Sequence, residues 1–171
     1  MAGRQAITML HVSDMQFGAH HRFGTDGMTD GDREHASLAA RLLKDLAWLR
    51  EKRGVAPDLI VASGDLAEWA RPAEFNHVHD FLSDLAEGLG LARDRVVMVP
   101  GNHDVNWKKC EAYFLNCQGD DHDPVLPYWP KWEPYFAMFS RFYADVRGWP
   151  PLASASPSTT FSDCHQDGCA T

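Results

Sequence analysis

The sequence predicts an α/β fold built on a parallel sheet, and two observations carry this prediction. Three short apolar runs, each as long as a buried strand, cover residues 7–12, 59–62 and 96–99. Longer stretches of helical periodicity separate them. A strand–helix–strand unit closes with a right-handed crossover, so the neighbouring strands are expected to be parallel.

Two helices are expected to connect the strands. The first spans about residues 32–53, with Asp30 or Asp32 as its N-cap and Gly54 at its end. The second spans about residues 72–87 and starts with a proline, whose missing N–H costs nothing in a first turn. Each has an apolar face at helical spacing: Leu38, Leu42, Leu46 and Leu49 in the first, and Phe75, Val78, Leu82 and Leu85 in the second.

Composition limits the classes of function. A chain of 171 residues with 44% apolar residues can form one domain with a core. Its net charge of −8 disfavours nonspecific binding to nucleic acid or membranes, so nucleic acid is considered only as a substrate. No apolar run reaches the roughly 20 residues of a membrane span, and the N-terminus lacks a secretion signal. We therefore expect a cytoplasmic protein.

The chain divides by composition. Residues 1–149 have the patterning of a folded domain, and residues 107–149 form an aromatic-rich insert that we expect to be a loop with turns, followed by a helix at about 134–146. Residues 150–171 are rich in Ser, Pro and Thr, as in a disordered tail or an ending foreign to the fold.

The cysteines match no strong zinc pattern, because their spacings are wide. Without a secretion signal, reduced thiols are expected. We expect ordinary buried or surface cysteines rather than a zinc site that uses His122 or His165. His11, on the first strand, is expected to be a hydrogen-bonded structural residue. The four cysteines are Cys110, Cys117, Cys164 and Cys169.

A short polar motif follows each predicted strand. In an open α/β sheet, ligands gather at the carboxyl ends of the strands, so these motifs should meet at one edge. Their carboxylate and amide oxygens suit a divalent cation or a pair of them. The motifs are Asp14-Met15-Gln16, Gly64-Asp65 and Gly101-Asn102-His103-Asp104.

In this order, the three motifs resemble those of the calcineurin-like metallophosphoesterases, over about residues 7–106. The resemblance implies an αββα sandwich that holds two metal ions and hydrolyses phosphate monoesters or diesters. Two departures stand out. Gln16 occupies a position where the family usually has His, and no lone His or Gly-His-x-His segment follows Asp104. The fold is therefore expected to be incomplete at its C-terminus, with a further segment or domain elsewhere.

The resemblance implies a role for each metal-binding residue. It assigns Asp14 to the first metal and Asn102 to the second, and Asp65 is our choice for the bridging carboxylate. Gln16 is expected to bind weakly or through a water. Oxygen-rich ligation favours manganese, with iron or zinc as alternatives. The competing interpretation of Asp14 and Asp65 is that each is only a cap or turn carboxylate after a strand.

The third motif also supplies candidate catalytic groups. His103 is expected to protonate the leaving oxygen or to hold the phosphate as an imidazolium. Asp104 is expected to orient the His103 ring and raise its pKa. The alternative is a turn in which both side chains merely satisfy backbone groups.

The leading functional hypothesis is metal-dependent hydrolysis of a phosphate ester by a water activated between two metals. Residues 64–75 resemble the phosphodiesterase-like branch, which favours a phosphodiester. Cyclic nucleotides, nucleic-acid ends and phospholipid head groups all remain open as substrates. The first alternative is a catalytically degenerate module that binds phosphate or a nucleotide, or docks a partner. The second is a purely structural domain. Since about half of the expected ligands are absent, we expect negligible activity from residues 1–171 alone.

Overall fold

The computed structural model describes residues 6–19, 21 and 37–147. Its centre is a parallel sheet in the order β1-β2-β3, made of β1 (Met9–Val12), β2 (Leu59–Ser63) and β3 (Val96–Val99). In the register, Ala62 of β2 lies opposite Val12 of β1. The predicted α/β class and the parallel sheet are confirmed. The first strand starts two residues later than predicted.

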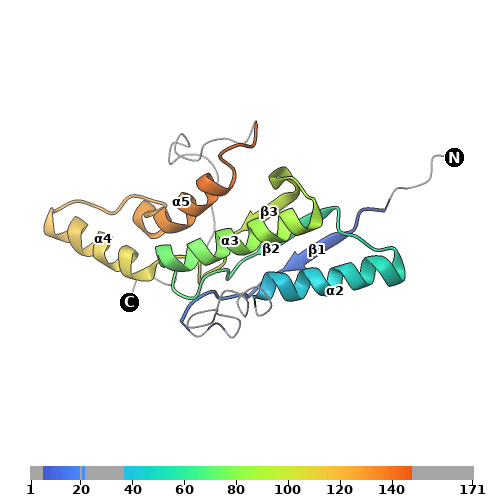
Figure 1. Ribbon diagram of the computed structural model, residues 1–171. Helices are drawn as coiled ribbons and strands as arrows, with labels where there is room; N and C mark the ends of the chain where they lie inside the picture. The colour runs from blue at the N-terminus through green and yellow to red at the C-terminus, as the bar shows by residue number, and fades with distance from the viewer. Residues whose placement is uncertain (1–5, 20, 22–36, 148–171) are drawn as a thin grey trace.

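Two helices connect the strands, as predicted: α2 (Leu38–Arg53) and α3 (Pro72–Leu89). The N-cap of α2 is Ser37, whose hydroxyl accepts from the Ala40 amide at 3.1 Å, rather than Asp30 or Asp32. Residues 22–36, where the predicted helix was to begin, lie outside the described part of the chain. Figure 1 shows α2 and α3 packed side by side on one face of the sheet.

The sheet is covered on one face only, within the residues described. Strand side chains that point to the helices, such as Ile60 and Val96, are fully buried. On the opposite face, Met9, Val97 and Val99 are 55%, 36% and 50% exposed. An α/β layer pair with a bare apolar sheet face is what one half of an αββα sandwich would present.

The aromatic-rich segment is more helical than predicted. It forms α4 (Trp107–Gly119), the short 3₁₀ turn η2 (Trp129–Lys131) and α5 (Glu133–Phe142). The expectation of a loop before the last helix was wrong over α4. Asn106 caps α4 by accepting from the Lys109 amide at 3.0 Å.

Packing explains where these helices lie. A short η1 turn (Arg93–Arg95) precedes β3, and the Arg93 guanidinium donates to the Phe142 carbonyl at the end of α5. Phe142 is fully buried in the same core cluster as Phe75 of α3. Of the four cysteines, Cys110 and Cys117 are buried in α4, as expected of ordinary core cysteines. The aromatic segment therefore extends the helical layer of the domain.

Two further expectations concern His11 and the C-terminal tail. His11 is a hydrogen-bonded structural residue as predicted, since its Nε2 lies 2.5 Å from the Ser63 hydroxyl on the neighbouring strand. The expected tail, residues 150–171, lies outside the described residues. Among the residues described, no helix has the length and apolar character needed to cross a membrane.

Candidate functional site

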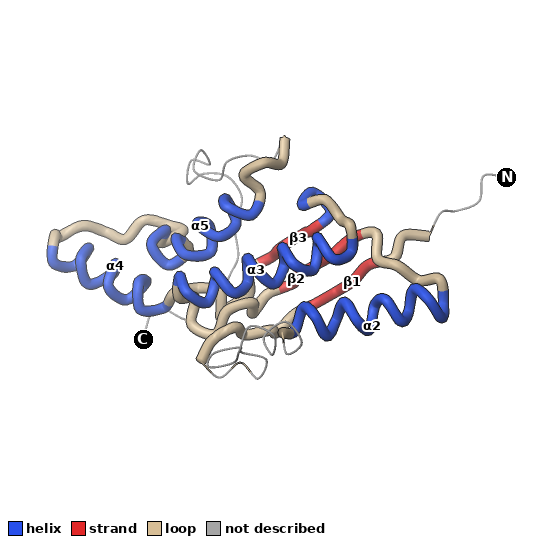
Figure 2. The backbone as a smooth tube through the Cα atoms, viewed as in Figure 1, coloured by secondary structure: helices blue, strands red, loops and turns tan. Residues whose placement is uncertain are grey.

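Backbone hydrogen bonds hold the first two motif loops together at the carboxyl ends of the strands. The Asp14 amide donates to the Gly64 carbonyl at 3.2 Å. Two residues later, the Gln16 amide donates to the Asp65 carbonyl at 2.9 Å. Figure 2 shows these loops gathered between the sheet and α4. The first two motifs thus run side by side, as the sheet topology predicts.

The second and third loops touch directly. The His103 amide donates to Oδ1 of Asp65 at 3.0 Å. A Cβ atom built at Gly101 would lie 2.3 Å from the same oxygen, so only glycine fits there. Gly64 also lies against Gly101, because a Cβ atom built on Gly64 would lie 3.0 Å from the Gly101 Cα. The φ of Gly64 is +83°, a value that also favours glycine. Glycine at both positions allows the Asp65 carboxylate to sit against the third loop.

Three of the predicted metal-binding residues have a strained backbone. The φ angles of Asp14, Gln16 and Asp65 are +55°, +45° and +52°, in the left-handed region that residues with a Cβ rarely adopt. Such strain costs of order 1–3 kcal/mol per residue and persists where the surrounding structure enforces it, typically at functional sites. The strain is consistent with a functional site on these loops. It is structural evidence, separate from the resemblance of the sequence motifs.

The predicted metal-binding side chains at this edge offer oxygen donors. The side chains of Asp14, Gln16 and Asn102 are exposed, and that of Asp65 is half-buried. Carboxylate and amide oxygens suit a hard divalent cation, so the donor type fits a metal. Within the described residues, however, no group of three or more His, Cys, Asp or Glu side chains is placed to hold a metal ion. The donor types at this edge therefore suit a divalent cation, but the described residues do not show a complete set of ligands.

The His103 ring is oriented by a backbone carbonyl. Its Nδ1 lies 3.0 Å from the carbonyl oxygen of Glu68 in the second loop. A carbonyl only accepts hydrogen bonds, so Nδ1 carries a proton, and Nε2 is the ring nitrogen that this carbonyl does not engage. No sequence pattern marks a backbone carbonyl as the partner of an imidazole, which is why this contact was not predicted.

Asp104 has a different role from the one predicted. Its side chain is fully buried and accepts hydrogen bonds from the amides of Leu66, Ala67 and Gly101 at 2.9, 2.8 and 2.8 Å. Burial raises the pKa of this carboxyl, against the opposing effect of these amide hydrogen bonds. The prediction that Asp104 orients the His103 ring was wrong, because the Glu68 carbonyl does so and Asp104 fastens the second loop to the third.

Sequence analysis missed one residue that organises this edge. The side chain of Asn106 caps α4 through its oxygen, and its Nδ2 donates to the Ala70 carbonyl at 3.1 Å. The next residue, Trp107, donates from its indole Nε1 to the Asn102 carbonyl at 3.3 Å. An Asn just before a helix is a recognisable cap signal and could have indicated where α4 begins.

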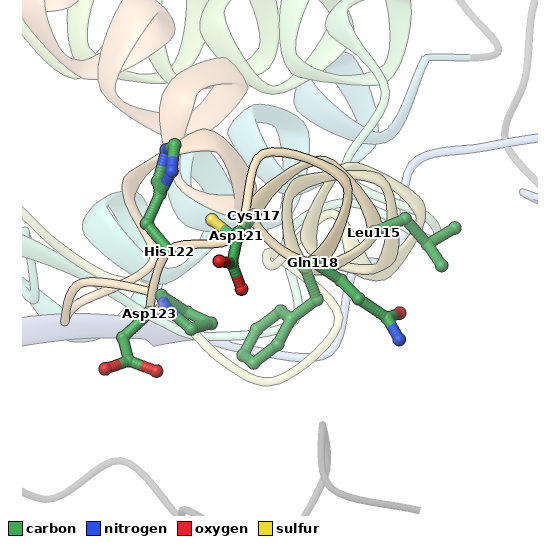
Figure 3. Close-up of a pocket in the computed structure, with 8 residues that line it drawn as sticks. Leu115, Cys117, Gln118, Asp121, His122 and Asp123 are labelled. Carbon is green, nitrogen blue, oxygen red and sulfur yellow. The ribbon is translucent and has the colours of Figure 1, made fainter.

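A separate hollow of about 830 Å³ opens at the far end of α4. Figure 3 shows His122, Asp121 and Cys117 around it. Nδ1 of His122 lies 2.9 Å from the Asp120 carbonyl. His122 is therefore engaged in its own turn, away from the three motif loops.

Comparison with known proteins decides the family. The family model for calcineurin-like phosphoesterases matches residues 7–168. The chain belongs to this family. The resemblance seen in the three motifs is thereby confirmed, and the α/β fold with its parallel sheet agrees with it. Calcineurin-like phosphoesterases are hydrolases of phosphate esters.

Two curated relatives are phosphodiesterases. The chain is 32% identical over 101 residues to the cAMP/cGMP dual specificity phosphodiesterase of Mycobacterium tuberculosis, over 59% of this chain and 28% of that protein. It is 29% identical over 100 residues to the glycerophosphodiester phosphodiesterase GpdQ of Enterobacter lignolyticus, over 57% of this chain and 30% of that protein. The matched region thus covers less than a third of either relative.

Proposed function

We propose that this calcineurin-like phosphoesterase chain contributes to metal-dependent hydrolysis of a phosphodiester. The observation that carries the proposal is the joining of three loops around Asp65, whose carbonyl and carboxylate accept from the Gln16 and His103 amides. Both curated relatives named above are phosphodiesterases, which favours a diester over a monoester.

The proposed metal ligands are the oxygen donors of the three loops. Asp14 would bind the first ion, Asn102 the second, and Asp65 would bridge them. Gln16, an exposed amide on a strained backbone, would act through a water. Two divalent ions, when bound, supply an activated water and neutralise charge on the phosphoryl oxygens. Oxygen-rich ligation favours manganese over the softer metals.

His103 is the proposed general acid. The ring would act as an imidazolium: its Nδ1–H donates to the Glu68 carbonyl, and its second proton, on Nε2, would pass to the leaving oxygen and leave the neutral ring behind. As an imidazolium, the ring would also attract the negative phosphoryl group. Asp104 does not touch the ring in this proposal and keeps the second and third loops in register through its three amide hydrogen bonds.

The site needs additional donors to hold two ions. The described residues supply two carboxylates and two amides at this edge, and the matched relatives are more than three times as long as the region they share with this chain. We place the missing ligands on a further segment, which would also cover the bare face of the sheet. Residues 1–171 alone should then be close to inactive.

The test is turnover of bis(p-nitrophenyl) phosphate with manganese, for the 171-residue chain alone and inside a longer protein that adds the missing segment. Activity is expected only in the longer protein and should disappear with Asp65→Asn. The matched control is Asp45→Asn, which alters an exposed aspartate of α2 and should leave turnover unchanged. A longer protein that binds manganese but never turns over the diester would contradict catalysis and support a phosphate-binding module.

A further inference from the structure

Two exposed tryptophans lie in the backbone segments next to residues proposed for chemistry. Trp69 is 59% exposed and directly follows Glu68, whose carbonyl oxygen bonds the His103 ring. Trp107 is 42% exposed, and its indole nitrogen donates to the Asn102 carbonyl at 3.3 Å. Isolated exposed tryptophans are ordinary on a protein surface. Here, Trp107 contacts Asn102 directly, and Trp69 is next in the chain to Glu68, the residue that bonds the His103 ring.

One side chain brings the two tryptophan segments together. Nδ2 of Asn106 donates to the Ala70 carbonyl at 3.1 Å. Ala70 follows Trp69 in the chain, and Asn106 precedes Trp107. The second loop and the start of α4 are therefore fastened to each other at the point where both tryptophans emerge.

The Trp107 indole is also fixed before any ligand arrives. Its edge is held by the hydrogen bond to Asn102, and the Lys131 ammonium lies 5.9 Å from its ring centroid. Lys131 is anchored in turn, because its carbonyl accepts from the Asn106 amide at 3.0 Å. A preorganised aromatic side chain loses little conformational entropy on binding, which favours stacking on a ligand.

We propose that Trp69 and Trp107 form a recognition surface for a planar base carried by the phosphodiester, so that the substrate is a nucleotide. This inference rests on the proposed function. An indole face stacks on any nucleobase without needing a particular hydrogen-bond pattern. The base would lie against the tryptophans while the phosphate reaches the edge that Asp65 and Asn102 occupy.

The charge beside Trp107 disfavours the main alternative ligand. Aromatic side chains also bind quaternary ammonium groups, such as the choline of a phospholipid head group, through cation–π attraction. Around Trp107 that role is taken by Lys131, whose ammonium lies near the rings of Trp107 and Tyr128 at 5.9 and 5.2 Å. A second cation would meet repulsion there, whereas a neutral base would not.

The test compares two ligands with the same phosphate, adenosine 5′-monophosphate and ribose 5-phosphate, by calorimetry on the manganese-loaded chain. Stacking predicts that the adenosine ligand binds roughly 5- to 150-fold more tightly. Trp69→Leu and Trp107→Leu should each reduce this ratio, and Trp107→Phe, which keeps a ring, should retain more of it than Trp107→Leu. The control is Trp48→Leu, which removes a tryptophan that is 54% exposed on α2 and should leave the ratio unchanged.

The outcomes separate this inference from the proposed function. Equal affinity for the two ligands, or a ratio that neither Leu variant at Trp69 or Trp107 alters, overturns the aromatic surface and leaves the phosphate site standing. A ratio that depends on the two tryptophans but not on manganese or Asp65 supports the surface and contradicts the metal site. Failure of both ligands to bind overturns the aromatic surface and leaves the proposed function standing, because residues 1–171 are expected to hold only part of the metal site. Thermal unfolding of each variant shows whether it is folded.

Discussion

The amide of His103 donates a hydrogen bond of 3.0 Å to Oδ1 of Asp65, and this contact joins the third motif loop to the second. It fixes the carboxylate oxygen in front of the Gly101 backbone, where a Cβ would not fit. The proposed acid and the proposed bridging ligand therefore belong to one rigid unit. Substitutions within this unit should affect metal binding, catalysis and stability in separable ways.

Gly101→Ala should disrupt the unit from its centre. The new Cβ would lie 2.3 Å from Asp65 Oδ1 and 2.5 Å from the Asp65 amide nitrogen, so the two loops must separate. Overpacking of this kind costs about 1–3 kcal/mol, and manganese affinity should fall with it. Urea unfolding and a manganese titration measure the two effects. Gly119→Ala is the control, since a Cβ there meets nothing within 4 Å. A stable Gly101→Ala variant with normal manganese affinity would refute the close approach.

Asp104→Asn should destabilise the fold. The carboxylate accepts from the Leu66, Ala67 and Gly101 amides, and an Asn side chain turns one acceptor into a donor that faces them. A buried group left unsatisfied costs roughly 1–3 kcal/mol in the free energy of unfolding. Asp94→Asn, at an exposed aspartate, should cost nothing measurable in the same urea titration. Unchanged stability in Asp104→Asn would mean that these hydrogen bonds are not formed in solution.

Asp104 and His103 show which features of the site can be predicted from the sequence and which cannot. The strands, the α3 helix and the meeting of three motifs at one edge were predictable, because apolar runs, a first-turn proline and parallel topology are all visible in the chain. The function of Asp104 could not be predicted, since two of its partners, the Leu66 and Ala67 amides, belong to another loop. The Glu68 carbonyl that orients His103 is equally invisible, because every residue has a carbonyl.

The α4 helix was missed for another reason. Its buried residues Cys110 and Cys117 are two turns apart, and Trp107 and Leu115 are exposed at 42% and 61%, so its apolar face is weakly marked. The packing of α4 and the aromatic segment against the rest of the domain decides its conformation, and such contacts leave no local pattern. The left-handed backbone of Asp14 and Gln16 is likewise imposed by the neighbouring loop.

Gln16→His should tighten manganese binding by roughly tenfold, the equivalent of about 1.4 kcal/mol. Imidazole is a better ligand than a neutral amide for such ions, and His tolerates the positive φ of +45° found at this position better than most residues. Calorimetric titration of both proteins with manganese measures the change, and Gln16→Asn serves as the control that keeps an amide. No gain with His would show that residue 16 does not reach the metal, directly or through water.

His103→Ala should slow turnover by roughly 10²- to 10⁴-fold, the usual contribution of a general acid, in a longer protein that has activity. Manganese content should stay near normal, because His103 is the proposed general acid, held at Nδ1 by the Glu68 carbonyl, and is not among the proposed ligands. Steady-state kinetics and metal analysis of the same preparation provide both values. The exposed His77 of α3 supplies the control substitution, His77→Ala. Loss of metal in parallel with activity would assign His103 to ligation instead.

The most direct test of the account is calorimetric titration of the 171-residue chain with manganese, before and after Asp65→Asn. Because the three loops provide donors for part of the site, we predict that one ion at most binds well and that Asp65→Asn abolishes this binding while the circular dichroism spectrum stays the same. Manganese binding that is unchanged in Asp65→Asn would remove Asp65 from the site and contradict the proposed centre.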